Sequence, residues 1–453
     1  MKSGSGIQRN AISRSNCHVI VEKMIANPLV FIGLREIAGY FSNLKRGFEE
    51  LGVKCTLLDL AGNPSRYDNG QNPLWVRWLS GTASALGVHF ARSFVLRFIW
   101  LTVFQSLFSI VAFVIAVVRY DVFILGGNST FFFFLELPLL RLLGKKVIYV
   151  FLGSDSRPIY LNGAAYKGEG NVLVVKAGTW VQKRVVRVIE SLATACINHP
   201  PQAYFHERPF ISVLYIGLPY AGPTRPPEAI VPVPIGQPVQ IIHIPSKAGP
   251  KGSDRFRAII ERLKLRHEIE YTEMSGITNS EVLKIITQAD FALDEFFSDS
   301  PMAVFATECA FHSVPVVVGS YYASEIENDY AREDLPPSMF VHPDNMEQAI
   351  EKMIVDTRFR QDLGRAAYTF VSTRWKARDV AARYLQIVDG TSPPAAWYDP
   401  YRLRYVHGAG LHEDELRTNI KQFTKGGDTS SLMLNDKPEV IRALITQTDF
   451  DNG

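Results

Sequence analysis

The chain has 453 residues, of which 47% are hydrophobic and 21% are charged, so it is long enough for two α/β domains and a tail and is not a disordered protein. The formal net charge is only +3, which argues against a global field that would recruit nucleic acid. The four cysteines lack the paired spacing of a metal site, so we expect reduced thiols in a cytosolic protein, with neither disulfides nor zinc.

The N-terminal part opens with a polar segment and a βαβ unit. Residues 1–27 contain no long apolar run, so we expect a flexible leader and not a secretory signal. An apolar strand at 29–33 ends in glycine, helical periodicity follows at 40–51, and a second strand is expected at 54–58. The intervening loop makes Gly33 a candidate ligand-binding residue, but its glycines do not follow GxGxxG, so NAD binding has little support.

The segment 98–118 is almost continuously apolar and has the length of a membrane span. A strand expected at 120–125 follows at once, and a spanning helix would separate it from its own sheet. A buried helix is therefore favoured, and a helix half-immersed in the bilayer surface stays open because Arg92, Arg97 and Trp100 stand near one end. The second option predicts peripheral membrane contact through 94–118.

The remaining pattern predicts two Rossmann-like domains. Strands are expected at 120–125, 147–152, 194–197 and 212–216, which completes a doubly wound parallel sheet over residues 28–218. A proline-rich linker is expected at 219–238, because proline interrupts both helices and central strands. The βα alternation resumes over 239–389 as a second such domain. Residues 390–453 form a polar tail, for which packing back on the first domain is one option.

The most informative segment is 289–320, which reads as strand, loop, acid-bearing helix and strand. A strand is expected at 291–293, and Asp299, Ser300 and Pro301 have the residue types of a helix start. Glu308 would lie two turns into that helix, and a buried strand would return at 314–318. Because helix N-termini hold anions, the segment predicts a phosphate site. Its start supplies further candidate binding residues, Met302, Ala303 and Val304.

A basic loop follows the strand that begins the second domain, in the sequence IIHIPSKAGPKG. Its candidate binding residues are Ser246, Lys247, Lys251 and Gly252. Lysines at the carboxyl end of a strand can neutralise a leaving diphosphate, although two surface lysines on a solvated loop are the alternative. His243 precedes the loop, and a hydrogen-bonded strand histidine is favoured there over a ligand contact.

Polar residues also follow two other strands. Asp294 and Glu295 come after the strand expected at 291–293, at the edge where such sheets bind ligands. They are either ligand-binding residues or surface acids of a loop. Gly153, Asp155 and Arg157 come after 147–152, and they either face an acceptor or a donor sugar across a cleft or form a capped turn with a salt bridge. His199 ends an expected strand and either lines the cleft or is a structural histidine before a proline turn, and the structural role is favoured.

The segments VIYVFLGSDSR, IIHIPSKAGPKG and ADFALDEFFSDSPMAVFATECAFHSVPVVVGS together resemble retaining glycosyltransferases of the GT-B fold, in the large family-four type that includes many bacterial polysaccharide enzymes. The resemblance spans roughly residues 28–385. It implies two Rossmann-like domains facing across a cleft. It also implies that Lys251 and Gly252 grip the donor diphosphate, that Glu308 binds donor hydroxyls, and that Asp155 serves the acceptor side.

The chain departs from the family pattern at three positions. Ser246 stands where relatives have arginine, Ser300 where they have a glutamate, and Leu152 where many have histidine. The missing histidine is compatible with retaining transfer, because the leaving phosphate oxygen can itself accept the acceptor proton. The missing glutamate leaves the donor sugar and the activity itself open.

The resemblance therefore implies a transferase that needs no cofactor beyond a nucleotide-diphosphate sugar as donor substrate. A metal-independent reaction is expected from the residues, because the DxD spacing of Asp449 and Asp451 lies at the end of the chain and cationic side chains with a helix N-terminus can neutralise the diphosphate instead. The acceptor would be a glycan or a lipid-linked glycan, in surface polysaccharide assembly at the cytoplasmic face of a bacterial membrane. Two alternatives remain. One is a catalytically reduced scaffold that binds nucleotide sugar or glycan as a partner subunit, and the other is a nucleotide-sugar epimerase.

Overall fold

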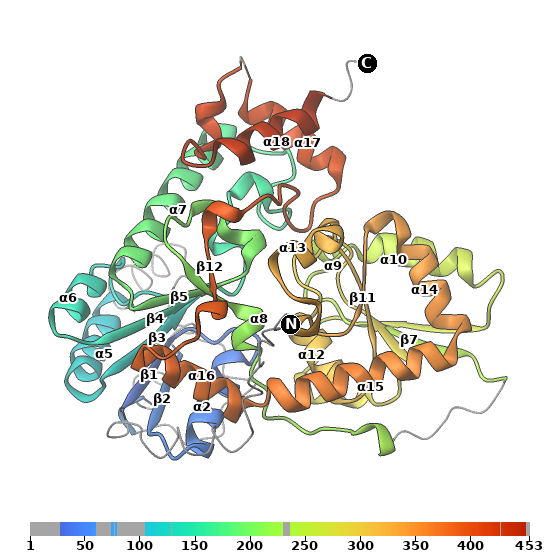
Figure 1. The fold of residues 1–453 in the computed structure, drawn as a ribbon, viewed down its shortest axis with the longest axis horizontal. Coiled ribbons are helices and arrows are strands. Elements are labelled where there is room, and N and C mark those ends of the chain that lie inside the picture. Colours follow the sequence, from blue (N-terminus) through green and yellow to red (C-terminus); the bar gives the residue numbers. More distant parts are fainter. Residues whose placement is uncertain are drawn as a thin grey trace, which may run out of the picture.

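The computed structural model describes residues 28–59, 74–76, 78, 105–127, 129–229, 236–425 and 427–449. The expected leader 1–27 and the first part of the apolar segment, with Arg92, Arg97 and Trp100, lie outside the described residues. Two α/β domains stand side by side, and a C-terminal region lies against the first of them (Figure 1).

The N-terminal domain is built on a seven-stranded sheet in the order β12-β6-β5-β4-β3-β1-β2. All neighbouring strands are parallel except β12, which pairs antiparallel with β6. The strands are β1 (Val30–Leu34), β2 (Cys55–Asp59), β3 (Val122–Gly126), β4 (Lys146–Val150), β5 (Ala195–Asn198), β6 (Phe210–Ser212) and β12 (Trp397–Tyr398). Their central members are apolar and buried, as expected of a parallel sheet covered on both faces.

Alternate strand residues point to two separate apolar cores. In β1, Phe31 belongs to the core under α5 (Gln105–Arg119), α6 (Glu136–Leu142) and α7 (Val172–Leu192). Its neighbours Val30 and Ile32 belong to the core under α2 (Tyr40–Glu50) and α16 (Ala377–Asp389). The two-residue period of a strand thus assigns each helix to one face of the sheet.

The C-terminal domain has a five-stranded parallel sheet in the order β11-β10-β9-β7-β8. Its strands are β7 (Val239–His243), β8 (Ile269–Glu273), β9 (Phe291–Leu293), β10 (Val316–Gly319) and β11 (Met339–Val341). Its helices are α9 (Ala248–Lys251), α10 (Ser253–Leu263), α11 (Asn279–Ile286), α12 (Val304–Phe311), α13 (Ile326–Asp329), α14 (Met346–Val355) and α15 (Thr357–Arg374). The expectation of two doubly wound α/β domains is confirmed.

The strand order of the C-terminal sheet reverses between β7 and β9, because β8 lies on one side of β7 and β9 on the other. Open α/β sheets bind ligands outside the carboxyl ends of their strands at such a reversal. The basic loop follows β7, and Asp294 follows β9 directly. The topology therefore brings these two sequence-predicted segments together.

The tail lies on the N-terminal domain. Strand β12 extends the sheet edge, and α17 (Glu413–Phe423) and α18 (Pro438–Asp449) follow (Figure 1). Asn419 Nδ2 donates a hydrogen bond to the carbonyl of Tyr160 at 2.9 Å, and Tyr160 Oη donates to the carbonyl of Leu432 at 2.8 Å. These buried bonds attach the tail at well-defined positions.

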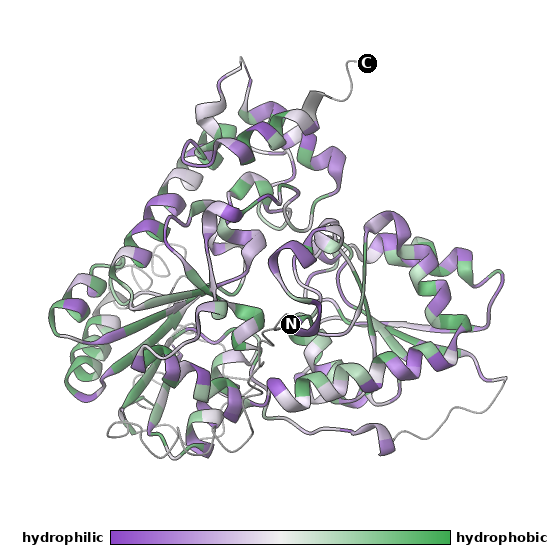
Figure 2. Ribbon diagram, viewed as in Figure 1, coloured by the Kyte–Doolittle hydropathy of each residue, from purple (hydrophilic) through white to green (hydrophobic). Residues whose placement is uncertain are grey.

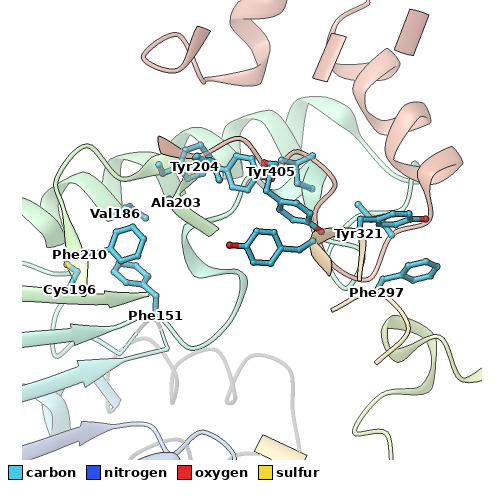
Figure 3. Close-up of a cluster of buried hydrophobic side chains, with 14 of the residues drawn as sticks. Phe151, Val186, Cys196, Ala203, Tyr204, Phe210, Phe297, Tyr321 and Tyr405 are labelled. Carbon is cyan, nitrogen blue, oxygen red and sulfur yellow. Dashed lines mark hydrogen bonds between the residues drawn. The ribbon is translucent and has the colours of Figure 1, made fainter. Parts of the chain in front are cut away.

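An aromatic cluster joins the tail to both domains (Figure 3). Tyr204 of the N-terminal domain donates its hydroxyl to the carbonyl of Tyr405 at 2.9 Å, and the Tyr405 ring lies 5.2 Å from that of Tyr322 in the C-terminal domain. Phe297 and Tyr321 stack beside it at 5.7 Å. Offset and edge-to-face aromatic pairs of this kind stabilise an interface beyond their buried area.

The chain passes between the domains twice, and the two passages touch. The amide of Tyr220, in the expected linker, donates to the carbonyl of Trp375 at 3.2 Å. The amide of Ala377 donates to the carbonyl of Tyr220 at 2.9 Å. Immediately beyond, α16 packs on α2 so closely that a Cβ added to Gly47 would lie 2.0 Å from the carbonyl oxygen of Ala377.

Two local predictions were wrong. The strand expected at 212–216 is a strand only up to Ser212, after which α8 (Val213–Ile216) begins, because the Ser212 side chain accepts the amide hydrogen of Leu214 and caps that helix. The helix expected to begin at Pro301, after Asp299 and Ser300 as caps, begins at Val304 instead. Hydroxyls of Ser298 and Ser300 bond to backbone groups two residues further on, which holds that stretch in a turn.

The apolar segment forms α5 in its described part, from Gln105 onward. Ala112 and Ala116 are buried against the sheet, whereas Val114 and Val118 on the opposite side are exposed. None of the described helices combines the length and the apolar character needed to cross a bilayer.

Candidate functional site

Lys251 ends α9 and lies at the strand reversal of the C-terminal sheet. Its Nζ is 2.9 Å from Asp294 Oδ1 and also contacts the Glu295 carboxylate. Burial lowers the pKa of Lys251, but the two carboxylates outweigh burial and raise it above its ordinary value. The ammonium group therefore stays charged throughout the physiological range.

The backbone fixes this lysine against the residues that follow β9. The amide of Phe296 donates to the Lys251 carbonyl at 3.1 Å. Gly252 has a φ of 71°, and an added Cβ would come within 2.5 Å of Phe296 Cβ, so only glycine fits. Ser246 and Lys247, earlier in the same loop, are exposed to solvent.

Glu308 is buried in the second half of α12, with 8% of its surface exposed. Its Oε1 accepts a hydrogen bond from Asn279 Nδ2 at 2.7 Å. Burial raises the pKa of Glu308 to about 7, and the charge of Asp294 acts in the same direction while the Asn279 bond opposes it. Asp294 is thus electrostatically coupled to both Lys251 and Glu308.

A small pocket places Glu308 at the junction of the domains. The C-terminal domain contributes Val304, Thr307 and Glu308, and the N-terminal domain contributes side chains from the loop after β1 and from the start of α2. The remaining lining residues are Ala38, Tyr40, Asn43, Leu218, Pro219 and Tyr220. Gly33 is not among them, because it lies inside β1 rather than in the loop.

The raised pKa of Glu308 predicts how stability depends on pH. The folded-state pKa of about 7 exceeds the ordinary value of 4.5, so protonation favours the folded state. This contribution is fully present below pH 4.5 and is lost as the pH rises through 7. Glu308→Gln imitates the protonated form, so we expect it to be more stable than the parent by roughly 3 kcal/mol at pH 8 and similar to it near pH 4.5.

Urea unfolding at a series of pH values measures this difference. Glu261→Gln is a matched control, because that side chain is 68% exposed and its replacement should change stability by less than about 0.5 kcal/mol. A Glu308→Gln protein whose stability tracks that of the parent at every pH would show that Glu308 titrates normally.

The N-terminus of α12 faces this site without a capping side chain. The first amides of a helix have no intrahelical partners, so those of α12 remain suited to an anion. Val304 lines the pocket, Ala303 is the N-cap, and Met302 is buried behind it. By contrast, the first amides of α2 are already bonded, because Glu36 accepts hydrogen bonds from Phe41 and Ser42 there.

Arg157 and Asp299 form a buried ion pair between the domains. Their side chains are 0% and 5% exposed, and Gln202 Nε2 also donates to Asp299 Oδ2 at 3.3 Å. Burial lowers the pKa of Arg157, and Tyr204, Tyr405 and Glu295 partly offset this. Arg157 thus connects the turn after β4 to the loop before α12.

The other candidates occupy distinct environments. Asp155 and Gly153 lie half-buried in the turn after β4, where the Asp155 carbonyl accepts a bond from Gln182. His199 is partly exposed at the end of β5, and desolvation together with Arg157 lowers its pKa to about 3, so it is neutral. His243 has both ring nitrogens bonded, to the carbonyl of Leu293 and to Ser253 Oγ, and is a structural histidine.

Several site residues have no distinctive sequence signal. Asn279, the partner of Glu308, follows Thr278 in the capping box TNSE, which predicts a helix start but not a contact with α12. Asn43 and Tyr220 reach the pocket only through the packing of the two domains. In the described residues, no group of three or more His, Cys, Asp or Glu side chains could hold a metal ion.

Comparison with known proteins gives no family model that matches and no match among curated proteins. Solved structures match at low identity. Anabaena HepE in complex with UDP-glucose is 9% identical, with a TM-score of 0.46 over 80% of this chain and 99% of that one. Sucrose-phosphate synthase from Thermosynechococcus elongatus is 11% identical, with a TM-score of 0.46 over 81% and 99%.

A further similar structure is the glycosyltransferase SnogD from Streptomyces nogalater, at 12% identity and a TM-score of 0.37 over 79% and 99% of the two chains. All three TM-scores are below 0.5. The assignment of function therefore depends on the geometry of this chain and not on these likenesses.

Proposed function

We propose that the protein is a glycosyltransferase that transfers a sugar from a nucleotide-diphosphate sugar to an acceptor hydroxyl. One observation supports this above all others. Lys251, Asp294 and Glu308 gather at the strand reversal of the C-terminal sheet, beside an uncapped helix and a pocket shared with the other domain. A cation and free helix amides suit a diphosphate, and acidic side chains suit the hydroxyls of ribose and sugar.

In this proposal the diphosphate binds at Lys251 and at the first amides of α12, near the exposed Ser246 and Lys247. Lys251 would have to release one carboxylate, and Glu295 is the better candidate because it is 24% exposed against 3% for Asp294. Asp294 retains a buried oxygen, Oδ2, without a hydrogen-bond partner among the described residues. That oxygen is available to a ligand hydroxyl.

The transfer breaks the bond between the anomeric carbon and the diphosphate oxygen and forms a bond from that carbon to the acceptor oxygen. Lys251 stabilises the negative charge that develops on the leaving diphosphate. The acceptor hydroxyl passes its proton to the leaving phosphate oxygen, which would give retention of configuration. Glu308 binds donor hydroxyls, and Asp155, in the turn after β4, orients the acceptor.

The same proposal places the enzyme in bacterial surface polysaccharide or glycoconjugate assembly, with a glycan or lipid-linked acceptor and in the cytoplasm. This setting is supported by the family resemblance of the loop and helix segments. A metal-independent reaction is supported by the presence of a cationic side chain and helix amides where charge would develop.

A second candidate is a scaffold that binds a nucleotide sugar or a glycan without transferring it. The observation that favours it is the charge state of the site. Lys251 is already neutralised by two carboxylates, and Ser300, where relatives have an acid, donates its hydroxyl to the carbonyl of Met302. The site therefore carries less free positive charge than a diphosphate would favour.

Calorimetric titration with UDP, GDP, ADP and CMP tests both candidates, followed by an assay for nucleotide release from the matching sugar donor with a glycan acceptor. Selective binding of one diphosphate and acceptor-dependent release would support the transferase. Binding without release from any donor would support the scaffold. Failure of every nucleotide to bind would refute the transferase.

A further inference from the structure

The outer surface of the N-terminal domain is unusually apolar on one side. Among the described residues, 21 large apolar side chains are exposed, and four of these lie on α5, five on α6 and its flanking loops, and five on α7. Phe133 and Leu142 are 81% and 82% exposed. Surface apolar residues are normally scattered, so a concentration on three neighbouring helices indicates an interaction surface.

These helices cover one face of the sheet side by side, so their outward sides form one surface. Each buries its inner residues in the same core, and α7, α6 and α5 follow one another along the left side of the molecule in Figure 1. Arg141 of α6 donates to the carbonyl of Ser191 in α7 at 2.6 Å, which fixes these two helices together. Apolar stretches are visible along them in Figure 2.

The apolar residues of α7 form a stripe that faces away from the core. Leu173, Trp180, Val181 and Val188 are exposed and recur at helical spacing, whereas Val186 and Ile189 of the same helix are buried. A helix that serves only its own domain would place polar residues on its outer face. We call the exposed apolar side of α5, α6 and α7, with Phe133, the outer apolar face.

Most of the charged residues within the three helices are basic, although Asp121, just after α5, pairs with Lys145, and Glu207 pairs with Arg187 of α7. The sequences of the three helices contain only two acids, Glu136 and Glu190, and both are buried. Glu136 accepts the amide hydrogens of Phe131 and Phe132, and Glu190 accepts the amide hydrogen of Arg208. Both carboxylates are therefore hydrogen-bonded inside the domain and do not face the solvent.

Basic side chains stand among the apolar ones. Arg119 and Arg141 are exposed in the last turns of α5 and α6, Lys146 is exposed at the start of β4, and the guanidinium of Arg184 lies over the Trp180 ring at 5.1 Å. Exposed tryptophan beside arginine on an apolar stripe is the composition of surfaces that lie at the boundary between lipid headgroups and acyl chains.

We propose that the outer apolar face docks the protein on a bilayer that contains anionic phospholipid, with the apolar side chains entering the headgroup boundary and the basic ones contacting phosphates. The charge distribution favours this occupant over a second copy of the chain, because two such faces would bring their arginines and lysines together. The inference does not depend on the proposed transfer reaction. The proposed surface extends the peripheral membrane contact expected at residues 94–118 to α6 and α7.

Flotation of the full chain with lipid vesicles tests the proposal. One set of vesicles is pure phosphatidylcholine, and the other contains roughly one third phosphatidylglycerol. We expect binding to the second set only, and a loss of at least about tenfold in the variant Leu142→Asp/Trp180→Asp. The matched control is Leu265→Asp/Val355→Asp, which alters two exposed apolar residues of the C-terminal domain and should bind like the parent.

All four replaced side chains are exposed, so the melting temperatures should stay close to that of the parent. The proposal is overturned if the parent floats with neither vesicle, if it floats equally with both, or if the Leu142→Asp/Trp180→Asp variant floats as well as the parent. Light scattering tests the alternative that a second copy of the chain binds to the outer apolar face. A parent dimer that this variant converts to a monomer would assign the face to self-association instead.

Discussion

Replacing Lys251 with alanine is expected to reduce binding of the matching nucleoside diphosphate at least about 100-fold and to reduce transfer further, because the cation would no longer offset the diphosphate charge. It should also destabilise the fold by about 3 kcal/mol, since the Asp294 and Glu295 carboxylates would lose their shared partner. Calorimetric titration and urea unfolding measure the two effects separately.

Lys264→Ala is the matched control, because Lys264 lies in the same domain and, among the described residues, forms its ion pair with Glu261 on the surface. It should leave both binding and stability within error of the parent. If Lys251→Ala destabilises the protein but binds the nucleotide normally, Lys251 is a structural cation and the donor site lies elsewhere.

Arg157→Met is expected to destabilise the protein by about 3–5 kcal/mol, the largest effect among the single variants considered. The replacement removes one member of a buried ion pair and leaves Asp299 charged between the domains. Chemical unfolding monitored by fluorescence measures the loss, and Arg332→Ala, which affects a highly exposed pair with Glu327, should cost less than about 1 kcal/mol.

The double variant Arg157→Met/Asp299→Leu tests whether the unpaired Asp299 carboxylate or lost packing around Arg157 causes the loss of stability. If the uncompensated carboxylate is responsible, the second replacement should recover most of the stability, because well-packed apolar residues can substitute for a buried pair. A double variant as unstable as Arg157→Met alone would show that packing around Arg157, beside Tyr204 and Tyr405, causes the loss.

The sequence predicted the features that depend on local pattern. Strand 291–293 and the helix from Tyr40 have the expected positions, since apolar runs and helical periodicity are local properties. The start of α12 was misplaced because Asp299, Ser300 and Pro301 suit a helix start equally well as a turn. Asp299 instead bonds to the other domain, which the local sequence does not encode.

The contacts that define the site were beyond prediction from one sequence. The sequence places Glu308 two turns into a helix, but the hydrogen-bond partner of Glu308, Asn279, depends on how α11 and α12 pack. In the sequence Lys251 and Asp294 are independent candidates in separate segments, and their ion pair follows from the strand order β9-β7-β8. Pairing of strands distant in sequence is a tertiary property, so only the structure shows that one lysine is shared by two acids.

The pairing of β12 with β6, together with the packing of α16 on α2, has a consequence for synthesis of the chain on the ribosome. Domains generally fold in the order in which they emerge. Here the N-terminal sheet lacks an edge strand and the apolar side of α2 lacks its cover until residues 377–398 have been made, after the whole C-terminal sheet. The domain that emerges first is therefore completed last, and the nascent N-terminal half would be a client for chaperones that shield apolar surface.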